Sequence, residues 1–180
     1  MTVKKYNGFK VQLNKIVVGR LIDDPNRRAI PTNLQRAKTV GVLFVVNQEK
    51  DLEEIRAILK QINNENVQTF ALGYIPTKKP DDFYLSQKAF NFFSDIDLDF
   101  VLRPKSQEAY EFMNSKFDLL IDMGTMDYYP MQYIMYKSKA KFKIGWFGDK
   151  QPFDLMMSID PKKGILYYFE QILHYLQNFN

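Results

Sequence analysis

The residues of this chain that are best suited to chemistry follow its apolar, strand-like segments. Asp122 ends the strongly apolar residues 117–122, and Asn47 follows the apolar residues 40–46. In open α/β sheets, ligands bind beyond the carboxyl ends of the strands, near the point where the strand order reverses. The sequence therefore predicts a ligand site at that edge, built from Asn47, Lys79, Arg103, Asp122, Gly124 and Thr125.

Arg103 and Lys79 would give the predicted site a preference for anions. A guanidinium or ammonium group beside a helix N-terminus can hold a phosphate or a carboxylate. Asp122 permits two interpretations: a general base, or a cap that accepts backbone N–H bonds from the following loop. We prefer the second. Asp118 begins the same strand roughly 13 Å away, so these two carboxylates cannot act as a catalytic pair.

Several kinds of chemistry are excluded by what the chain lacks. It has no cysteine, which excludes thiolate nucleophiles, disulfides and cysteine-ligated metals. Its one histidine leaves too few imidazoles for a multi-histidine metal site. Residues 47–49 (Asn-Gln-Glu) follow the first strand, where a dinucleotide or Walker A loop would need glycines, and there is no Gly-x-Ser-x-Gly motif. We therefore predict no cofactor and no bound metal.

The predicted elements that position these residues alternate between strands and helices. Strands are predicted at 40–46, 67–74, 98–102 and 117–122, and helices at 50–63, 105–115, 129–139 and 163–178, with a short helix within 83–93. Residues 139–145 and 153–159 alternate between apolar and polar side chains, which is typical of peripheral strands. Only about five residues separate this pair, so an antiparallel edge hairpin is predicted.

This pattern predicts an α/β fold, a three-layer αβα sandwich with a Rossmann-like, mainly parallel sheet of five or six strands. Residues 38–180 would form a single α/β domain. Residues 1–37 would precede it as a basic arm, with an amphipathic helix at 9–22 that Asp23-Asp24-Pro25-Asn26 ends. No apolar run approaches the roughly 18 residues of a spanning helix, and no signal-peptide core is present, so a cytoplasmic protein is expected.

Charge is distributed unevenly along the chain. Residues 1–38 hold nine of the 25 basic residues and two acids, a net charge of +7, whereas residues 39–180 hold 16 bases and 19 acids, a net charge of −3. The arm could bind RNA or an anionic membrane surface, but we prefer docking on the domain or homo-oligomerisation. Alternating lysines at 137, 139, 141 and 143 suit a nucleic-acid surface or, as we prefer, the protection of an exposed sheet edge.

Four segments together resemble an uncharacterised domain family of Bacteroidetes proteins, over residues 37–180. They are AKTVGVLF at 37–44, LGY at 72–74, FDLLID at 117–122 and SKAKFKIG at 138–145. The resemblance implies a bacterial cytoplasmic protein of unknown function and supplies no catalytic residues. FDLLIDM and then KAKFKIGWF are also similar to the N-terminal half of heptosyltransferase-like glycosyltransferases, which implies a Rossmann-like sheet. This chain has Asn47 where those enzymes carry an acid, and it has no room for their second domain.

These observations predict a non-catalytic binding or interaction module that recognises an anionic small molecule at the strand ends. One alternative is an enzyme acting on a phosphorylated or sugar-like substrate, with Asp122 as the base and Arg103 or Lys79 holding the anion. Another alternative is a protein that associates with RNA or a membrane surface through its basic arm.

Overall fold

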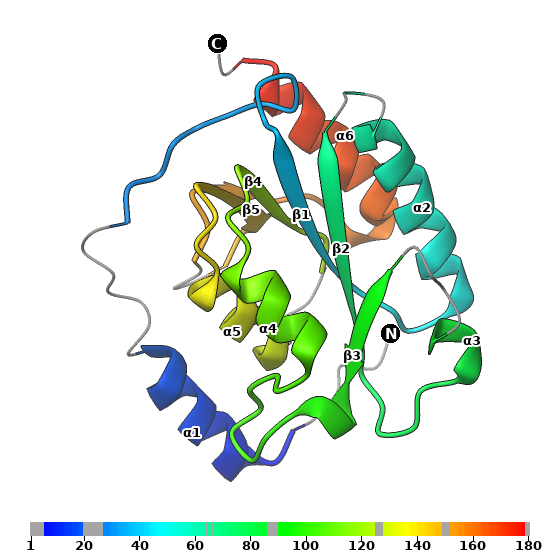
Figure 1. Ribbon diagram of the computed structural model, residues 1–180, viewed down its shortest axis with the longest axis vertical. Helices are drawn as coiled ribbons and strands as arrows, with labels where there is room; N and C mark the ends of the chain where they lie inside the picture. The colour runs from blue at the N-terminus through cyan, green and yellow to red at the C-terminus, as the bar shows by residue number, and fades with distance from the viewer. Residues whose placement is uncertain are drawn as a thin grey trace.

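Six parallel strands form one sheet in the described structure (Figure 1). The computed structural model describes residues 6–19, 27–63, 65, 67–85, 90–124, 128–148 and 152–178. The strands are β1 (Thr39–Val45), β2 (Gln68–Ile75), β3 (Asn91–Ser94), β4 (Leu119–Asp122), β5 (Phe142–Trp146) and β6 (Leu155–Met157). Their order, β3-β2-β1-β4-β5-β6, is that of the doubly wound dinucleotide-binding fold. The predicted Rossmann-like α/β fold is confirmed.

Helices cover both faces of the sheet, as the predicted three layers require (Figure 1). α2 (Glu49–Asn63) and α6 (Gly164–Leu176) lie on one face, and α4 (Gln107–Asn114) and α5 (Tyr129–Lys137) lie on the other. α3 (Asp82–Leu85) is a single turn before β3. α1 (Gly8–Gly19) corresponds to the predicted helix at 9–22. Residues 20–22 of that prediction, and the predicted break at 23–26, lie outside the described residues.

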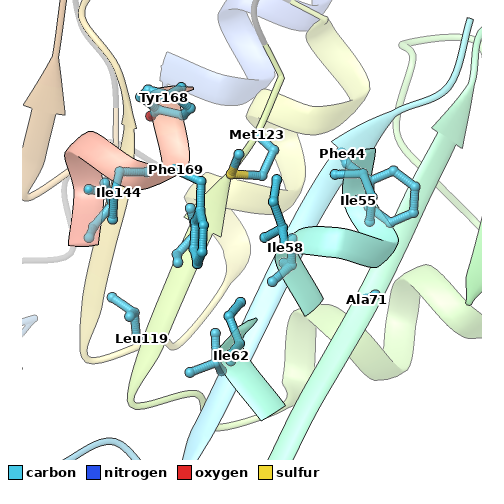
Figure 2. Close-up of a cluster of buried hydrophobic side chains, with 14 of the residues drawn as sticks. Phe44, Ile55, Ile58, Ile62, Ala71, Leu119, Met123, Ile144, Tyr168 and Phe169 are labelled. Atoms are coloured by element: carbon cyan, nitrogen blue, oxygen red, sulfur yellow. The ribbon is translucent and has the colours of Figure 1, made fainter. Parts of the chain in front are cut away.

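β1 is buried on both sides because each of its faces meets a layer of helices. Val42 and Phe44 join the core under α2 and α6, whereas Leu43, between them, joins the core under α4 and α5. Figure 2 shows the first of these cores, where Ile58 of α2 and Phe169 of α6 lie over the strands. A strand covered on both faces needs a nearly continuous apolar sequence, and TVGVLFV supplies it.

The predicted antiparallel hairpin is wrong, because β5 and β6 run parallel. The Asp154 N–H donates to the Lys143 carbonyl at 2.8 Å, so the chain has returned to the amino end of β5 before β6 begins. The Phe153 ring covers Gly145, where a Cβ would lie 2.2 Å from a ring carbon. Because β6 has only three residues, the return spans roughly 10 Å. The few residues between Trp146 and Leu155 therefore take the place of the long crossover that the prediction assumed a parallel pair would need.

The third strand also lies earlier in the chain than predicted. β3 occupies Asn91–Ser94, whereas residues 98–102 belong to an irregular connection, the β3–α4 segment (residues 95–106). Asp99 shapes its turn, since Oδ1 accepts the N–H groups of Val101 and Arg103, both at 2.9 Å. Leu102 has a φ of 64°, a left-handed conformation that is foreign to strands. Arg103 therefore follows a turn rather than a strand.

β5 is an internal strand, although its alternating lysines predicted a peripheral position. Lys143 is 2% exposed, and its ammonium group donates to the Met135 carbonyl in the last turn of α5 at 2.6 Å. A cation at this end of a helix satisfies a carbonyl that the helix leaves unpaired. Lys141 pairs instead with Asp118 at 2.7 Å. The alternation thus reflects a helix cap and an ion pair rather than an exposed edge.

Residues near the N-terminus contact the rest of the chain at both ends of the sheet. Asn14 of α1 is 1% exposed, and its Nδ2 donates to the Val101 carbonyl at 2.8 Å. α1 also packs against α5. At the amino end of the strands, Arg27 forms a two-pronged ion pair with Asp154, at 2.8 and 2.5 Å. The division of the chain into an arm and a domain stays a prediction.

Candidate functional site

The strands β1 and β4 end at different levels beside the point where the strand order reverses. Leu43 pairs with Asp122, the last residue of β4, while β1 continues to Val45. Asn47 comes after the end of β1, so it stands beyond the level of Asp122. The Tyr128 hydroxyl, from the chain after β4, donates to Asn47 Oδ1 at 3.4 Å. Asp122 and Asn47, which were predicted to share a site, thus lie at different levels along the strand direction.

Asp122 is enclosed by the turn that follows it. Its side chain is buried, and Oδ1 accepts the backbone N–H of Gly124 at 2.8 Å. A Cβ on Gly124 would lie 2.9 Å from Met131 Cε and 3.0 Å from Asp122 Oδ1, so the turn is closely packed. Thr125 lies outside the described residues. This hydrogen bond is of the kind that a loop-capping carboxylate makes.

The start of α2, beside Asn47, already holds negative charge. Asp51 Oδ2 accepts the N–H groups of Asn47 at 2.8 Å and Gln48 at 3.1 Å. Glu49 adds a second carboxylate to the same first turn. These acids offset the positive end of the helix dipole, which is the feature that attracts phosphates in dinucleotide-binding folds. The arrangement therefore disfavours an anion at Asn47.

Arg103 and Lys79, the two predicted anion-binding residues, differ in their surroundings. Arg103 Nε donates to Asp99 Oδ2 at 2.7 Å, and this hydrogen bond raises the pKa of the guanidinium group. The charge of Arg103 is thus balanced within its own turn. Lys79 follows β2 with an exposed side chain, and its backbone N–H donates to the Thr77 hydroxyl at 3.3 Å.

A groove of about 580 Å³ opens between α1 and the β3–α4 segment, beyond the carboxyl ends of β2 and β3. Tyr6, Lys10, Lys78, Asp95, Asp99 and Phe100 are among its lining residues. This volume falls within the usual range of small-molecule sites. The predicted residues Asn47, Lys79, Arg103, Asp122 and Gly124 are not part of the lining.

A chain of hydroxyl hydrogen bonds links two lining residues through a buried tyrosine. The Tyr74 hydroxyl donates to Asp95 Oδ1 at 2.6 Å and lies 2.7 Å from the Tyr6 hydroxyl. Since Tyr74 gives its proton to Asp95, Tyr6 is the donor to Tyr74. Burial raises the pKa of Tyr6 to about 12 and raises the pKa of Tyr74 further, so both phenols stay neutral at ordinary pH. These hydrogen bonds hold the Asp95 carboxylate in place and connect the start of α1 to β2.

Two lysines of the groove form no ion pair in the described structure. Of the two lining carboxylates, Asp99 is paired with Arg103 of its own turn, whereas the neutral Tyr74 hydroxyl leaves the negative charge of Asp95 in place. Lys10 and Lys78, in contrast, have no carboxylate partner within the described ranges. Lys10 Nζ lies 5.2 Å from the centroid of the Phe100 ring. The groove therefore offers two ammonium groups beside an aromatic face.

The site predicted from the sequence lies at the strand ends and does not coincide with this groove. It includes Lys79, the neighbour of the lining residue Lys78, but neither Tyr6 nor Asp95. One usable signal was present: aspartates alternate with apolar residues in DIDLD at 95–99. Aspartate favours turns because its side chain bonds to nearby backbone N–H groups, so this run suggests a turn-rich connection rather than a strand.

The described residues show neither a metal-binding group nor a membrane-spanning helix. Across the residues that the structure describes, no three His, Cys, Asp or Glu side chains form a group that could hold a metal ion. Among the described helices, none combines the length and the apolar character needed to cross a membrane.

Comparison with known proteins identifies the family of this chain. No curated protein and no solved structure matches it. A family model described as a family of unknown function matches residues 10–179, which include most of α1 and the whole sheet. The chain therefore belongs to the Family of unknown function (DUF6913).

Proposed function

We propose that this protein is a non-catalytic binding domain for an anionic small molecule, which it holds in the groove between α1 and the β3–α4 segment. The observation that carries the proposal is the pair Lys10 and Lys78, two lining ammonium groups without a carboxylate partner in the described part of the chain. A ligand phosphate or carboxylate would accept charge-assisted hydrogen bonds from these two ammonium groups.

The lining also favours a ligand with a flat or apolar part. Phe100 and Ile96 line the groove and are 59% and 63% exposed. A ligand body lying against them would remove apolar surface from water, which is favourable in proportion to the area covered. The best-supported class of ligand is thus a phosphate or carboxylate carried on a planar or partly apolar body, such as a nucleoside monophosphate.

The enzyme alternative has less support. It needs Asp122 near the anion that Arg103 or Lys79 would hold, yet none of the three lines the groove, and Arg103 is paired with Asp99. The likeness to heptosyltransferase-like enzymes supports a sugar phosphate as a ligand rather than as a reactant. A bacterial cytoplasm remains our proposal for where the protein works.

Thermal unfolding with added ligands tests this proposal. AMP and glucose 6-phosphate serve as anionic probes, and adenosine and glucose serve as their uncharged counterparts. A probe at a hundredfold excess over its dissociation constant stabilises the folded state by about 2.7 kcal/mol. For a chain of this size, the midpoint temperature would rise by roughly 5–10 °C. We expect this response to at least one anionic probe and not to its uncharged counterpart.

Two adjacent lysines provide a matched pair of variants, because Lys78 lines the groove and Lys79 does not. Lys78→Glu is expected to weaken binding of the responding probe by about tenfold or more, whereas Lys79→Glu should change it by about twofold at most. Equal effects of the two substitutions would reject this groove as the site. The absence of any response to either anionic probe would reject these two ligand classes.

A further inference from the structure

α1 exposes apolar side chains although its opposite face is docked. Asn14 and Val18 are buried against the rest of the chain, whereas Phe9 and Ile16 are 65% and 55% exposed. Phe9 and Ile16 are seven residues apart, so they lie on the same side of the helix, two turns from each other. The docked helix therefore presents a second apolar face to its surroundings.

The β3–α4 segment extends this apolar face into a patch, which we define as Phe9, Ile16, Ile96 and Phe100. The rings of Phe9 and Phe100 meet edge to face, with centroids 6.3 Å apart. Ile96 and Phe100 are exposed to a similar extent as the residues of α1. Four large side chains that leave water on contact with a partner would contribute several kcal/mol of binding free energy together. A surface of this kind marks an interaction site.

Positive charge accompanies the patch. Lys10 of α1 extends over the Phe100 ring, and Lys15 is exposed on the same helix. Lys78 adds a third ammonium group at the groove beside it. Lys10 and Lys15 are the basic residues of α1, which contains no acidic residue. The partner of this surface must therefore combine hydrocarbon with negative charge.

An anionic lipid bilayer meets both requirements, whereas a second copy of the chain and a nucleic acid each meet only one. Two copies of the chain meeting through this face would bring the same lysines against each other, because the same patch is used on both subunits. Nucleic acid would satisfy the lysines, but its interfaces are polar and would gain little from Ile16 and Ile96. Amphipathic helices that lie in a bilayer interface carry Phe, Leu or Ile on one face and lysines on their flanks.

We propose that α1 and the β3–α4 segment dock the protein peripherally on an anionic membrane. Phe9, Ile16, Ile96 and Phe100 enter the boundary between headgroups and acyl chains, and Lys10, Lys15 and Lys78 face the headgroup phosphates. This surface shares Lys10, Lys78, Ile96 and Phe100 with the groove, whereas Phe9 and Ile16 are not among the residues that line the groove.

Co-sedimentation with lipid vesicles tests the proposal. The full-length chain is mixed with vesicles of phosphatidylcholine alone or of phosphatidylcholine with phosphatidylglycerol. The wild type is expected to sediment with the anionic vesicles only. The double variant Phe9→Ser/Ile16→Ser should bind them about tenfold less or weaker still. Tyr110→Ser is the matched control, because this α4 residue is 62% exposed and lies outside the patch. It should bind like the wild type.

Three results would overturn the proposal. The first is a wild type that does not sediment with the anionic vesicles. The second is an equal response of the double variant and Tyr110→Ser. The third is dimerisation or RNA binding by the wild type that Phe9→Ser/Ile16→Ser abolishes, while the double variant still binds the vesicles. The double variant also keeps this test separate from that of the groove, because Phe9 and Ile16 do not line the groove and their replacement should leave binding of the anionic probes unchanged.

Discussion

Trp146 and Tyr168 stack with ring centroids 4.3 Å apart and an interplanar angle of 29°, and neither polar atom of the pair has a hydrogen-bond partner in the described structure. Trp146 ends β5, and Tyr168 comes from α6 on the face shown in Figure 2. Burial raises the pKa of the Tyr168 hydroxyl well above its ordinary value, so the group stays a neutral, unsatisfied donor. A buried donor without a partner lowers the free energy of unfolding, because it has lost its water.

Tyr168→Phe is therefore expected to stabilise the protein. The substitution removes the unsatisfied hydroxyl and keeps the ring that stacks on Trp146. We expect the free energy of unfolding to rise by about 1 kcal/mol, measured by urea denaturation. Tyr74→Phe is the control, since it removes a hydroxyl that does have partners, Tyr6 and Asp95. It should lower the free energy of unfolding by about 1–2 kcal/mol. If Tyr168→Phe also destabilised, its hydroxyl would have to be satisfied in solution.

Gly145→Ala is expected to disturb the return from β5 to β6. The new Cβ would lie 2.2 Å from the Phe153 ring, far inside contact distance. Overpacking of this kind costs about 1–3 kcal/mol of unfolding free energy, which denaturation can measure. The double variant Gly145→Ala/Phe153→Ala should show a positive coupling, because the second substitution removes the clash. Simple additivity of the two effects would contradict the close packing of Phe153 on β5.

Asp118 is expected to make stability depend on pH. Its carboxylate accepts bonds from Lys141 Nζ at 2.7 Å and from the N–H groups of Lys38 at 2.8 Å and Thr39 at 3.2 Å. Burial alone would raise the pKa of Asp118, but these hydrogen bonds outweigh it and lower the pKa below its ordinary value of 3.8. The folded state therefore favours the ionised form. Its contribution is present above about pH 5 and is lost as the pH falls through the folded pKa.

Unfolding experiments at several pH values check this expectation. Asp118→Asn should lower the free energy of unfolding by about 2 kcal/mol near neutral pH. The difference from the wild type should shrink in acid, where Asp118 is protonated in both states. Glu53→Gln, at an exposed position of α2, should have the same free energy of unfolding as the wild type at every pH. A deficit of Asp118→Asn that stays constant down to about pH 2 would show that charge is not the cause.

Asn14→Ala is expected to loosen α1 without unfolding the sheet. It removes the bond from Asn14 Nδ2 to the Val101 carbonyl, one of the few polar ties of the helix to the β3–α4 segment. A local loss of roughly 1–2 kcal/mol should accelerate amide hydrogen exchange at residues 8–19 and leave that of β1 unchanged. Lys15→Ala, on the exposed side of the helix, should alter neither. Equal acceleration across the sheet would mean that α1 and the core unfold as one unit.

Much of the fold can be predicted because its central strands have unambiguous sequences. β1 and β4 are buried on both faces, so TVGVLFV and LLID contain almost no polar residue to obscure them. β3 is only four residues long, and its NFFS sequence shows no periodicity. The sequence therefore favours the more apolar residues 98–102 as the strand. Residues 98–102 form a turn despite their apolar composition, because the Asp99 carboxylate accepts hydrogen bonds from the backbone of that turn.

The groove could not be predicted from strand ends alone. Its hydroxyl chain joins Tyr6 to Tyr74 across 68 residues, and its wall is a helix that precedes the sheet. A rule that places ligands beyond strand carboxyl ends finds Lys78 but has no means of finding Lys10. The same rule also predicts Asp122 as a site residue. The end of a strand is accessible to a ligand only where the following turn leaves it uncovered, and here the Gly124 N–H bonds back to the Asp122 carboxylate.

The strand order has a consequence for how this protein is made. β1 lies between β2 and β4, yet Lys38 and Asp118, which tie β1 to β4, are 80 residues apart. At a synthesis rate of about 5–20 residues per second, β4 is made roughly 4 to 16 seconds after β1. The edge of β1 that pairs with β4 stays unpaired for that time. During that interval a long apolar strand presents unpaired backbone groups to any other nascent chain. A strand that is covered on both faces in the finished molecule is thus the one most in need of a chaperone while the chain is incomplete.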